Sequence, residues 1–110
     1  MAGSDVFTGT LDLLILRTLR GGPLHGYAIG RWIRETSNGV LQVEEGALYP
    51  ALHRLEKKGF IRARWGQTEL NRPGRFYQLS QAGARRLEQE SERWREHARA
   101  VESVLEAARS

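Results

Sequence analysis

Gly46-Ala-Leu-Tyr-Pro-Ala-Leu-His-Arg-Leu-Glu-Lys-Lys-Gly-Phe-Ile61 contains an amphipathic helix that leads directly into an extended segment. At about 100° per residue, its three leucines fall on one arc, whereas Tyr49, His53 and Lys57 lie on or beside the opposite arc. Gly59 predicts the end of the helix, because glycine readily adopts the left-handed conformation of a helix C-cap. We therefore expect one face of this helix to pack against a core and the other to face a partner.

A β-hairpin is predicted directly after this helix. Residues 60–65 alternate between apolar and charged side chains, as a half-buried strand does. A break rich in turn-forming residues, 70–74, separates this run from a second extended run at residues 75–79. Arg72 and Arg75 flank the turn-forming residues, so the expected hairpin has a basic tip.

Three shorter elements are predicted before the amphipathic helix. They are a helix from Thr8 or Thr10 to Gly21, a second helix from Leu24 or His25 to residues 36–39, and a short strand at Val40–Val43. Together with the hairpin, these elements are typical of a winged helix-turn-helix domain, here residues 1–79. The expected fold class is mainly α with a small β-hairpin wing.

The rest of the chain, residues 80–110, is predicted to be one helix of about 28 residues, or roughly 42 Å, with Ser80 as its N-cap. A stripe of apolar and small residues recurs along it at alternating spacings of four and three, as in the seam of a coiled coil. The stripe consists of Leu87, Ser91, Trp94, Ala98, Val101 and Leu105. We expect a dimerisation helix that pairs two copies of the chain; the alternative is a helix that folds back on its own domain.

Composition limits the class of protein. A chain of 110 residues with 40% apolar content can fold as one small domain, and the absence of cysteine excludes disulfides and thiolate metal sites. The N-terminal residues lack the basic region of a secretory signal, and no apolar run approaches the length of a membrane span. We therefore expect a cytoplasmic protein with no cofactor and no metal.

The positive charge is concentrated on the amphipathic helix and the hairpin. Residues 53–75 hold seven Lys and Arg against two Asp and Glu, a net charge of +5, whereas residues 80–110 hold six of each, a net charge of zero. A polyanion explains this distribution, because phosphate contacts dominate nucleic-acid affinity. A membrane partner would need bulky apolar groups on the exposed face of a basic helix, and here the leucines point toward the core. Double-stranded DNA is the expected partner.

Seven residues are the candidates for DNA contact, four on the helix and three on the hairpin: Tyr49, His53, Arg54, Lys57, Arg64, Arg72 and Arg75. Each also has a purely structural interpretation. Tyr49 can pack at the edge of the core, and Arg54 can pair with Glu56 or Glu45. Exposed hairpin arginines are common on any protein. Glu44 and Glu45 suit the positive end of the helix, although they repel phosphate.

Each tryptophan also has two interpretations. Trp94 either fills the seam between two copies or stacks on a flat aromatic effector in a cavity between them. Trp32 and Trp65 are expected in the domain core, with Trp65 alternatively facing the same effector cavity.

The sequence also bears on two other classes of protein. An enzyme is disfavoured, since His25, His53 and His97 lie far apart in the sequence and no catalytic motif is present. A winged-helix module that binds protein without specific DNA binding is the remaining alternative, because a fold alone does not fix function.

Three stretches of the sequence resemble the PadR-like transcriptional regulators: Leu24-His-Gly-Tyr27, the long run 46–61 with its Leu-Tyr-Pro-x-Leu-x-Arg-Leu-Glu core, and Arg72-Pro-Gly-Arg-Phe-Tyr77 with the nearby Leu79-Ser80. The resemblance covers residues 8–108 and points to the compact branch of the family. It implies a winged helix with a single C-terminal dimerisation helix that binds a near-palindromic operator. It further implies repression of transcription and release from DNA by a small aromatic or drug-like effector.

Overall fold

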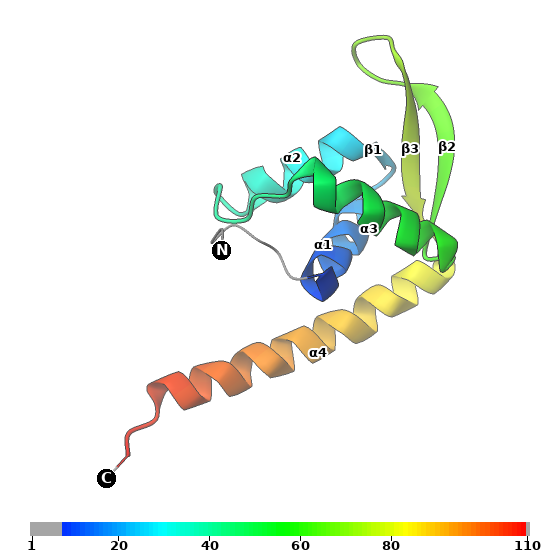
Figure 1. Cartoon of the computed structure of the whole chain (residues 1–110). Coiled ribbons are helices and arrows are strands. Elements are labelled where there is room, and N and C mark those ends of the chain that lie inside the picture. The colour runs from blue at the N-terminus through cyan, green and yellow to red at the C-terminus, as the bar shows by residue number, and fades with distance from the viewer. Residues whose placement is uncertain (1–7, 110) are drawn as a thin grey trace.

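The computed structural model describes residues 8–109 as four helices and a three-stranded antiparallel sheet. In chain order the elements are α1 (Thr8–Arg20), β1 (Leu24–His25), α2 (Gly26–Thr36), α3 (Glu45–Lys57), β2 (Ile61–Gln67), β3 (Pro73–Leu79) and α4 (Gln81–Glu106). In Figure 1 the β2–β3 hairpin projects from one end of a group of three short helices, and α4 runs away below them. This arrangement confirms the predicted winged helix-turn-helix with a long terminal helix.

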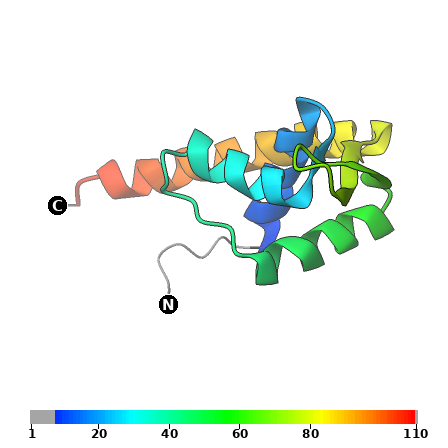
Figure 2. The same cartoon turned by 90° about the horizontal axis from the view of Figure 1, so that it is seen from above.

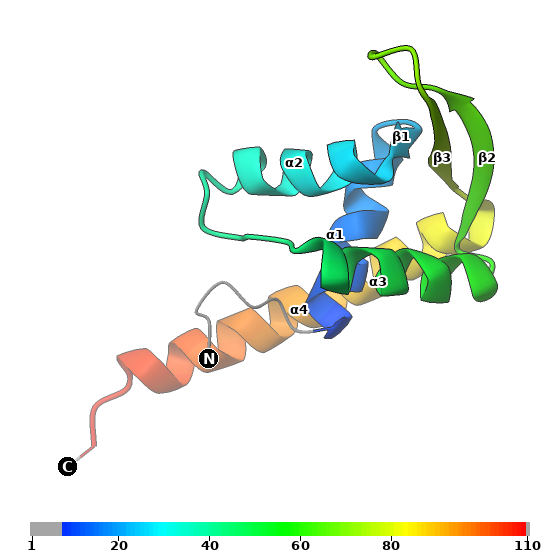
Figure 3. The same cartoon turned by 45° about the horizontal axis from the view of Figure 1, so that its top comes forward.

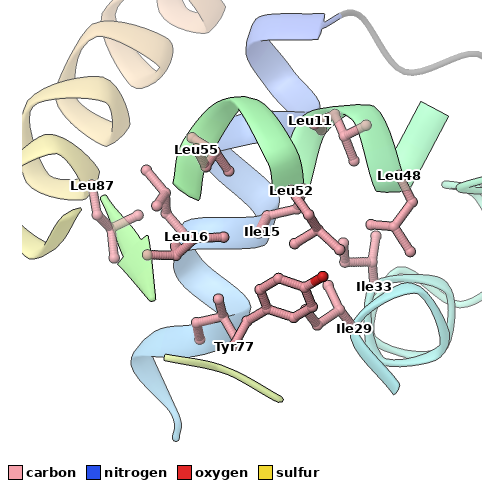
Figure 4. Packing of buried hydrophobic residues seen from close by; sticks show 13 residues of the cluster. Leu11, Ile15, Leu16, Ile29, Ile33, Leu48, Leu52, Leu55, Tyr77 and Leu87 are labelled. Atoms are coloured by element: carbon pink, nitrogen blue, oxygen red, sulfur yellow. The ribbon is translucent and has the colours of Figure 1, made fainter. Parts of the chain in front are cut away.

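The core is built around α1, which packs against α2, α3, β3 and α4. Burying each large aliphatic side chain contributes about 1.5–3 kcal/mol. Figure 4 shows these side chains meeting from every element except β1. The buried cluster consists of Leu11, Ile15, Leu16, Leu19, Ile29, Ile33, Leu48, Ala51, Leu52, Leu55, Ile61, Tyr77 and Leu87.

Helices α3 and α4 lie on different sides of α1, as Figure 2 shows. The first turns of α4 pack on α1, and Leu87 is buried there with 2% of its surface exposed. The sequence placed Leu87 in the intermolecular seam, and the structure corrects this, because the side chain already belongs to the core of its own domain. The second half of α4 projects beyond the domain.

The sheet has the strand order β1-β3-β2. Leu24 and His25, expected to begin a helix, instead pair with Tyr77 and Phe76 of β3. The helix begins one residue later because the Nδ1 atom of His25 accepts a hydrogen bond from the backbone N–H of Ala28 at 3.3 Å, which makes His25 the N-cap.

The predicted strand at Val40–Val43 is wrong. This segment is a linker between α2 and α3 that bends at Val40 and Leu41, and Leu41 and Val43 pack against the core. Its β-prone side chains thus serve packing, and the segment has no strand partner among residues 8–109.

A compact junction joins the end of α3 to the start of α4. Gly59 adopts a φ of 79°, as predicted, and its backbone carbonyl accepts a hydrogen bond from the Ser80 hydroxyl at 2.6 Å. The same hydroxyl oxygen accepts a hydrogen bond from the backbone N–H of Gly83 at 3.0 Å, which confirms Ser80 as the N-cap of α4. A Cβ atom on Gly83 would lie 2.0 Å from the backbone oxygen of Phe60, so only glycine fits this contact.

Candidate nucleic-acid interface

The outer face of α3 is available to a partner. Leu48, Leu52 and Leu55 are buried, whereas His53 and Lys57 are exposed and 44% of the Tyr49 surface is accessible. The predicted division of the helix into a packed face and an open face is confirmed.

Tyr49 is held in place by the first residue of α2. A Cβ atom on Gly26 would lie 2.8 Å from the ring carbon Cε1 of Tyr49 and 3.0 Å from its hydroxyl oxygen. The ring therefore packs directly on the backbone at Gly26, while nearly half of the side chain stays open to solvent. The packing expected of Tyr49 is therefore present, and the DNA contact predicted for it stays a prediction for the exposed part of the side chain.

Arg54 is committed to the domain. Its guanidinium lies 2.8 Å from the carboxylate of Asp12, which ties α3 to α1. The pairing predicted as the alternative, with Glu56 or Glu45, is wrong, because side chains two and nine residues away do not face Arg54 on a helix, and Glu56 pairs with Arg75.

Arg75 is likewise used inside the molecule. Its guanidinium lies 2.9 Å from the carboxylate of Glu56 and 5.8 Å from the ring centre of Tyr77. The pair joins the wing strand β3 to α3, so it fixes the angle between the two elements that face a partner.

The wing tip is formed by residues 68–72. The backbone N–H of Asn71 donates to the Thr68 carbonyl at 2.8 Å, and Asn71 takes a φ of 61°. The turn therefore lies earlier than expected, since Pro73 and Gly74 belong to β3. Arg72 remains exposed at this tip.

Arg64 lies on the outer face of the wing. It pairs with Phe76 of β3, and side chains on a strand alternate between the two faces of the sheet. The opposite face carries Trp65 and Tyr77, and it is this face that turns toward α3. Arg64 therefore points away from the other candidate residues.

Trp65 and Trp32 were expected in the core, and both assignments are wrong. Trp65 is 71% exposed, because the hairpin extends past the core and the inward face of β2 has no core behind it after Ala63. Trp32 is 37% exposed at the edge of α2, where Arg17 lies 5.8 Å from its ring centre.

A second set of polar residues near α3 was missed from the sequence. Tyr27, Arg31 and Arg34 lie on one face of α2 and line a hollow of about 260 Å³ beside the start of α3. Their spacing of four and three, opposite the buried Ile29 and Ile33, was the signal that could have identified them.

The two carboxylates predicted at the positive end of α3 line the same hollow. Glu44 is the N-cap of α3 and Glu45 lies in its first turn, as expected. The side chain of Glu44 makes no capping hydrogen bond, so its effect there is electrostatic alone.

Comparison with known proteins identifies the family. The model of the transcriptional regulator PadR-like family matches residues 15–89, which span the helix-turn-helix, the wing and the start of α4. The chain belongs to the PadR-like family of transcriptional regulators.

Similar proteins agree with this assignment. A transcriptional regulator from Clostridium thermocellum is 31% identical, with a TM-score of 0.81 over 91% of this chain and 97% of that one. A PadR family transcriptional regulator from Eggerthella lenta is 29% identical, with a TM-score of 0.77 over 91% of this chain and 85% of that one. Uncharacterized protein X of Lysinibacillus sphaericus is 30% identical over 96% of this chain and 97% of its own length.

Membership of a family of transcriptional regulators implies that this PadR-like chain binds DNA through its winged helix-turn-helix. Among residues 8–109, the PadR-like fold includes no helix with both the length and the apolar content needed to cross a membrane.

The contact between Gly26 and Tyr49 gives a prediction for this PadR-like regulator. Gly26→Ala should lower the free energy of unfolding by about 1–3 kcal/mol, because the new methyl group overlaps the tyrosine ring. In a Tyr49→Ala background the same change should be neutral or stabilising by up to about 1 kcal/mol, because the overlap is gone and alanine favours the helix. Urea unfolding of the four proteins at one concentration measures both effects, and equal losses in the two backgrounds would contradict the contact.

Proposed function

We propose that this PadR-like regulator is a homodimeric repressor that binds a near-palindromic DNA operator and is released by a small aromatic or drug-like effector. The observation that carries the proposal is the open face of α3, with Tyr49, His53 and Lys57, beside the exposed tip of the wing at Arg72. A helix of this diameter fits the major groove of DNA, and side chains from a neighbouring hairpin then reach phosphate or the minor groove.

The charges of this surface fit the role. Lys57 and Arg72 are exposed cations on the two elements that face the partner. Arg54 and Arg75 also lie there, and each already neutralises one carboxylate of the domain. In this proposal His53 reads base edges and Lys57 and Arg72 contact phosphates, with Tyr49 donating its hydroxyl to the backbone.

Repression is the simplest regulatory outcome of such a surface. A dimer with two α3 helices spaced about 34 Å apart covers two successive major grooves on one side of the duplex. Bound across a promoter, it blocks access to the DNA without needing any further contact. A reporter gene placed behind the operator distinguishes repression from activation by the sign of the response.

DNA binding is tested by selecting genomic fragments that the purified protein retains at moderate salt and then measuring affinity for the enriched site. The parent affinity should fall by about 10³–10⁵ between 50 and 200 mM salt if the dimer contacts six to ten phosphates. Tyr49→Ala combined with Arg72→Ala should weaken binding by about 2 kcal/mol or more, roughly thirtyfold, because each subunit loses hydrogen bonds to charged phosphate.

The control variant is Arg99→Ala, which removes one positive charge from the projecting part of α4 and should bind like the parent. A folded, paired Tyr49→Ala, Arg72→Ala protein with parental affinity would overturn the DNA-binding surface. An interaction that is insensitive to salt would favour the protein-binding alternative instead.

The projecting half of α4 supports the homodimer. Beyond Leu87, the stripe continues through Ser91, Trp94, Ala98, Val101 and Leu105, with Trp94 47% exposed and Leu105 73% exposed. An apolar stripe of this kind on an otherwise charged helix is expected to pack against a partner helix. A second copy offers the same stripe with two-fold symmetry.

Pairing can be tested with a charge placed on the stripe. Val101→Asp should raise the dissociation constant of the dimer by about a hundredfold or more, because the carboxylate would be buried without a partner. Ala100→Asp, one residue away on the outward face of α4, is the matched control and should remain paired. Sedimentation velocity measures both, and a paired Val101→Asp protein would contradict the α4 interface.

Trp94 supports the effector part of the proposal. Its indole is half-exposed near the middle of the apolar stripe, where two copies would bring two indoles close to the two-fold axis. Such an arrangement suits a flat aromatic ligand stacked between rings.

The effector is tested by titrating planar aromatic compounds into the protein while following tryptophan emission and operator binding. A true effector should quench the emission and weaken binding together, and Trp94→Phe should remove most of the quenching. Quenching that persists unchanged in the Trp94→Phe protein would place the ligand elsewhere and overturn the role of Trp94.

A further inference from the structure

An aromatic groove lies between the open face of α3, the start of α2 and the inner face of the wing. It has a volume of about 460 Å³ and opens to solvent. Figure 3 shows the three elements that surround it, with α3 below and the hairpin rising beside it. Its lining includes four aromatic residues, each with a polar group at the edge of its ring. Three of them, Tyr27, Tyr49 and Trp65, are exposed, and the fourth, Tyr77, is buried.

The chemistry of this aromatic groove suits a polyanion with apolar faces. Hydrogen-bond donors line it at Tyr49, His53 and Thr68. Among the described residues that line it, Glu56 has the sole carboxylate. The Arg75 guanidinium lies 2.9 Å from this carboxylate and neutralises its charge. Burial raises the pKa of the Tyr77 hydroxyl above its ordinary value of 10.0, although Arg75 acts in the opposite direction, so this phenol stays neutral near pH 7.

Trp65 is the residue that the rest of the fold does not explain. Its indole is 71% exposed on a strand face that turns toward α3, and it forms one wall of the aromatic groove. A large exposed aromatic group of this kind indicates an interaction site, because its burial by a partner is favourable.

The geometry of the duplex identifies what would pass through the aromatic groove. One sugar-phosphate strand separates each major groove of DNA from the neighbouring minor groove. If α3 lies in the major groove and the wing tip reaches the adjacent minor groove, that strand must cross the gap between them. This gap is the aromatic groove.

We propose that the aromatic groove receives one DNA backbone strand, with the Trp65 indole packed flat against a deoxyribose and the Tyr49 hydroxyl donating to a flanking phosphate. This inference rests on the proposed function, since it requires α3 and the wing to engage one duplex. Trp65 makes an apolar contact that is the same for every sequence, so it contributes to affinity without reading bases. Its role thus differs from the ionic contacts of Lys57 and Arg72.

The test compares Trp65→Ala with the parent on two duplexes, the operator recovered from the genomic selection and a scrambled duplex of equal composition. Trp65→Ala should weaken both complexes by the same factor, roughly tenfold for a dimer that loses two apolar contacts. The slope of log affinity against log salt should stay at its parental value, because no phosphate charge is lost. Arg72→Ala should instead lower that slope by about one for each contact removed.

Trp32→Ala is the matched control, since Trp32 is also a partly exposed tryptophan but does not line the aromatic groove. It should bind both duplexes like the parent. A second readout is acrylamide quenching: DNA should shield one tryptophan in the parent, and Trp65→Phe should abolish this protection. The effect of Trp65 on folding is checked by urea unfolding of Trp65→Ala, which should match the parent because the side chain is mostly exposed.

Three results would overturn the inference while leaving the proposed function intact. The first is a Trp65→Ala protein that binds DNA as tightly as the parent. The second is a loss of affinity in Trp65→Ala that is confined to the operator duplex. The third is a Trp65→Phe protein in which DNA still shields a tryptophan from acrylamide. A parent protein that retains neither duplex would overturn the proposed function itself, and the aromatic groove with it. Quenching of Trp65 by planar aromatic compounds, together with unchanged DNA affinity of Trp65→Ala, would assign the aromatic groove to a small ligand and count against the DNA strand.

Discussion

The arrangement of this molecule depends on a few hydrogen bonds of Ser80. Its hydroxyl donates to the Gly59 carbonyl and accepts from the Gly83 N–H, and its backbone N–H donates to the Phe60 carbonyl at 3.0 Å. These bonds join the end of α3, the start of β2 and the start of α4 at a single point. Gly83 allows α4 to approach the Phe60 carbonyl more closely than any side chain would permit. These bonds therefore connect the position of α4 to that of α3 and the wing.

Part of the positive charge that the sequence places on the partner-facing surface serves the fold. Arg54 holds α3 to α1 through Asp12, and Arg75 holds the wing to α3 through Glu56. Exposed ion pairs of this kind contribute little stability, about 0–1 kcal/mol, so their main effect is on geometry. Within the part of the chain that the structure describes, Lys57 and Arg72 form no ion pair. The surface therefore combines few available cations with aromatic and hydroxyl groups.

The fold could be predicted from the sequence because its main signals are local. The period of the leucines in α3, the φ of Gly59 and the cap at Ser80 depend on neighbouring residues alone, and all three agree with the structure. The errors concern contacts between distant parts of the chain. Leu24 and His25 form a strand only because β3 offers them an edge, and Trp65 is exposed because the hairpin outruns the core. Leu87 follows the period of the stripe, but its side chain packs in the core of its own domain, where α4 lies against α1. The candidate site was found as a set of residues, but their ion pairs and the aromatic groove required the three-dimensional arrangement.

The burial of Leu87 at one end of a 26-residue helix makes α4 a lever with its fulcrum in the domain. At 1.5 Å per residue the helix is about 39 Å long, so a tilt of about 5° at the fulcrum displaces the far end by roughly 3 Å. A partner or ligand that binds the far end of α4 can therefore change the angle at which α4 packs on α1. If two copies pair through this end of α4, as proposed, a small change in the angle of α4 changes the separation of their two α3 helices.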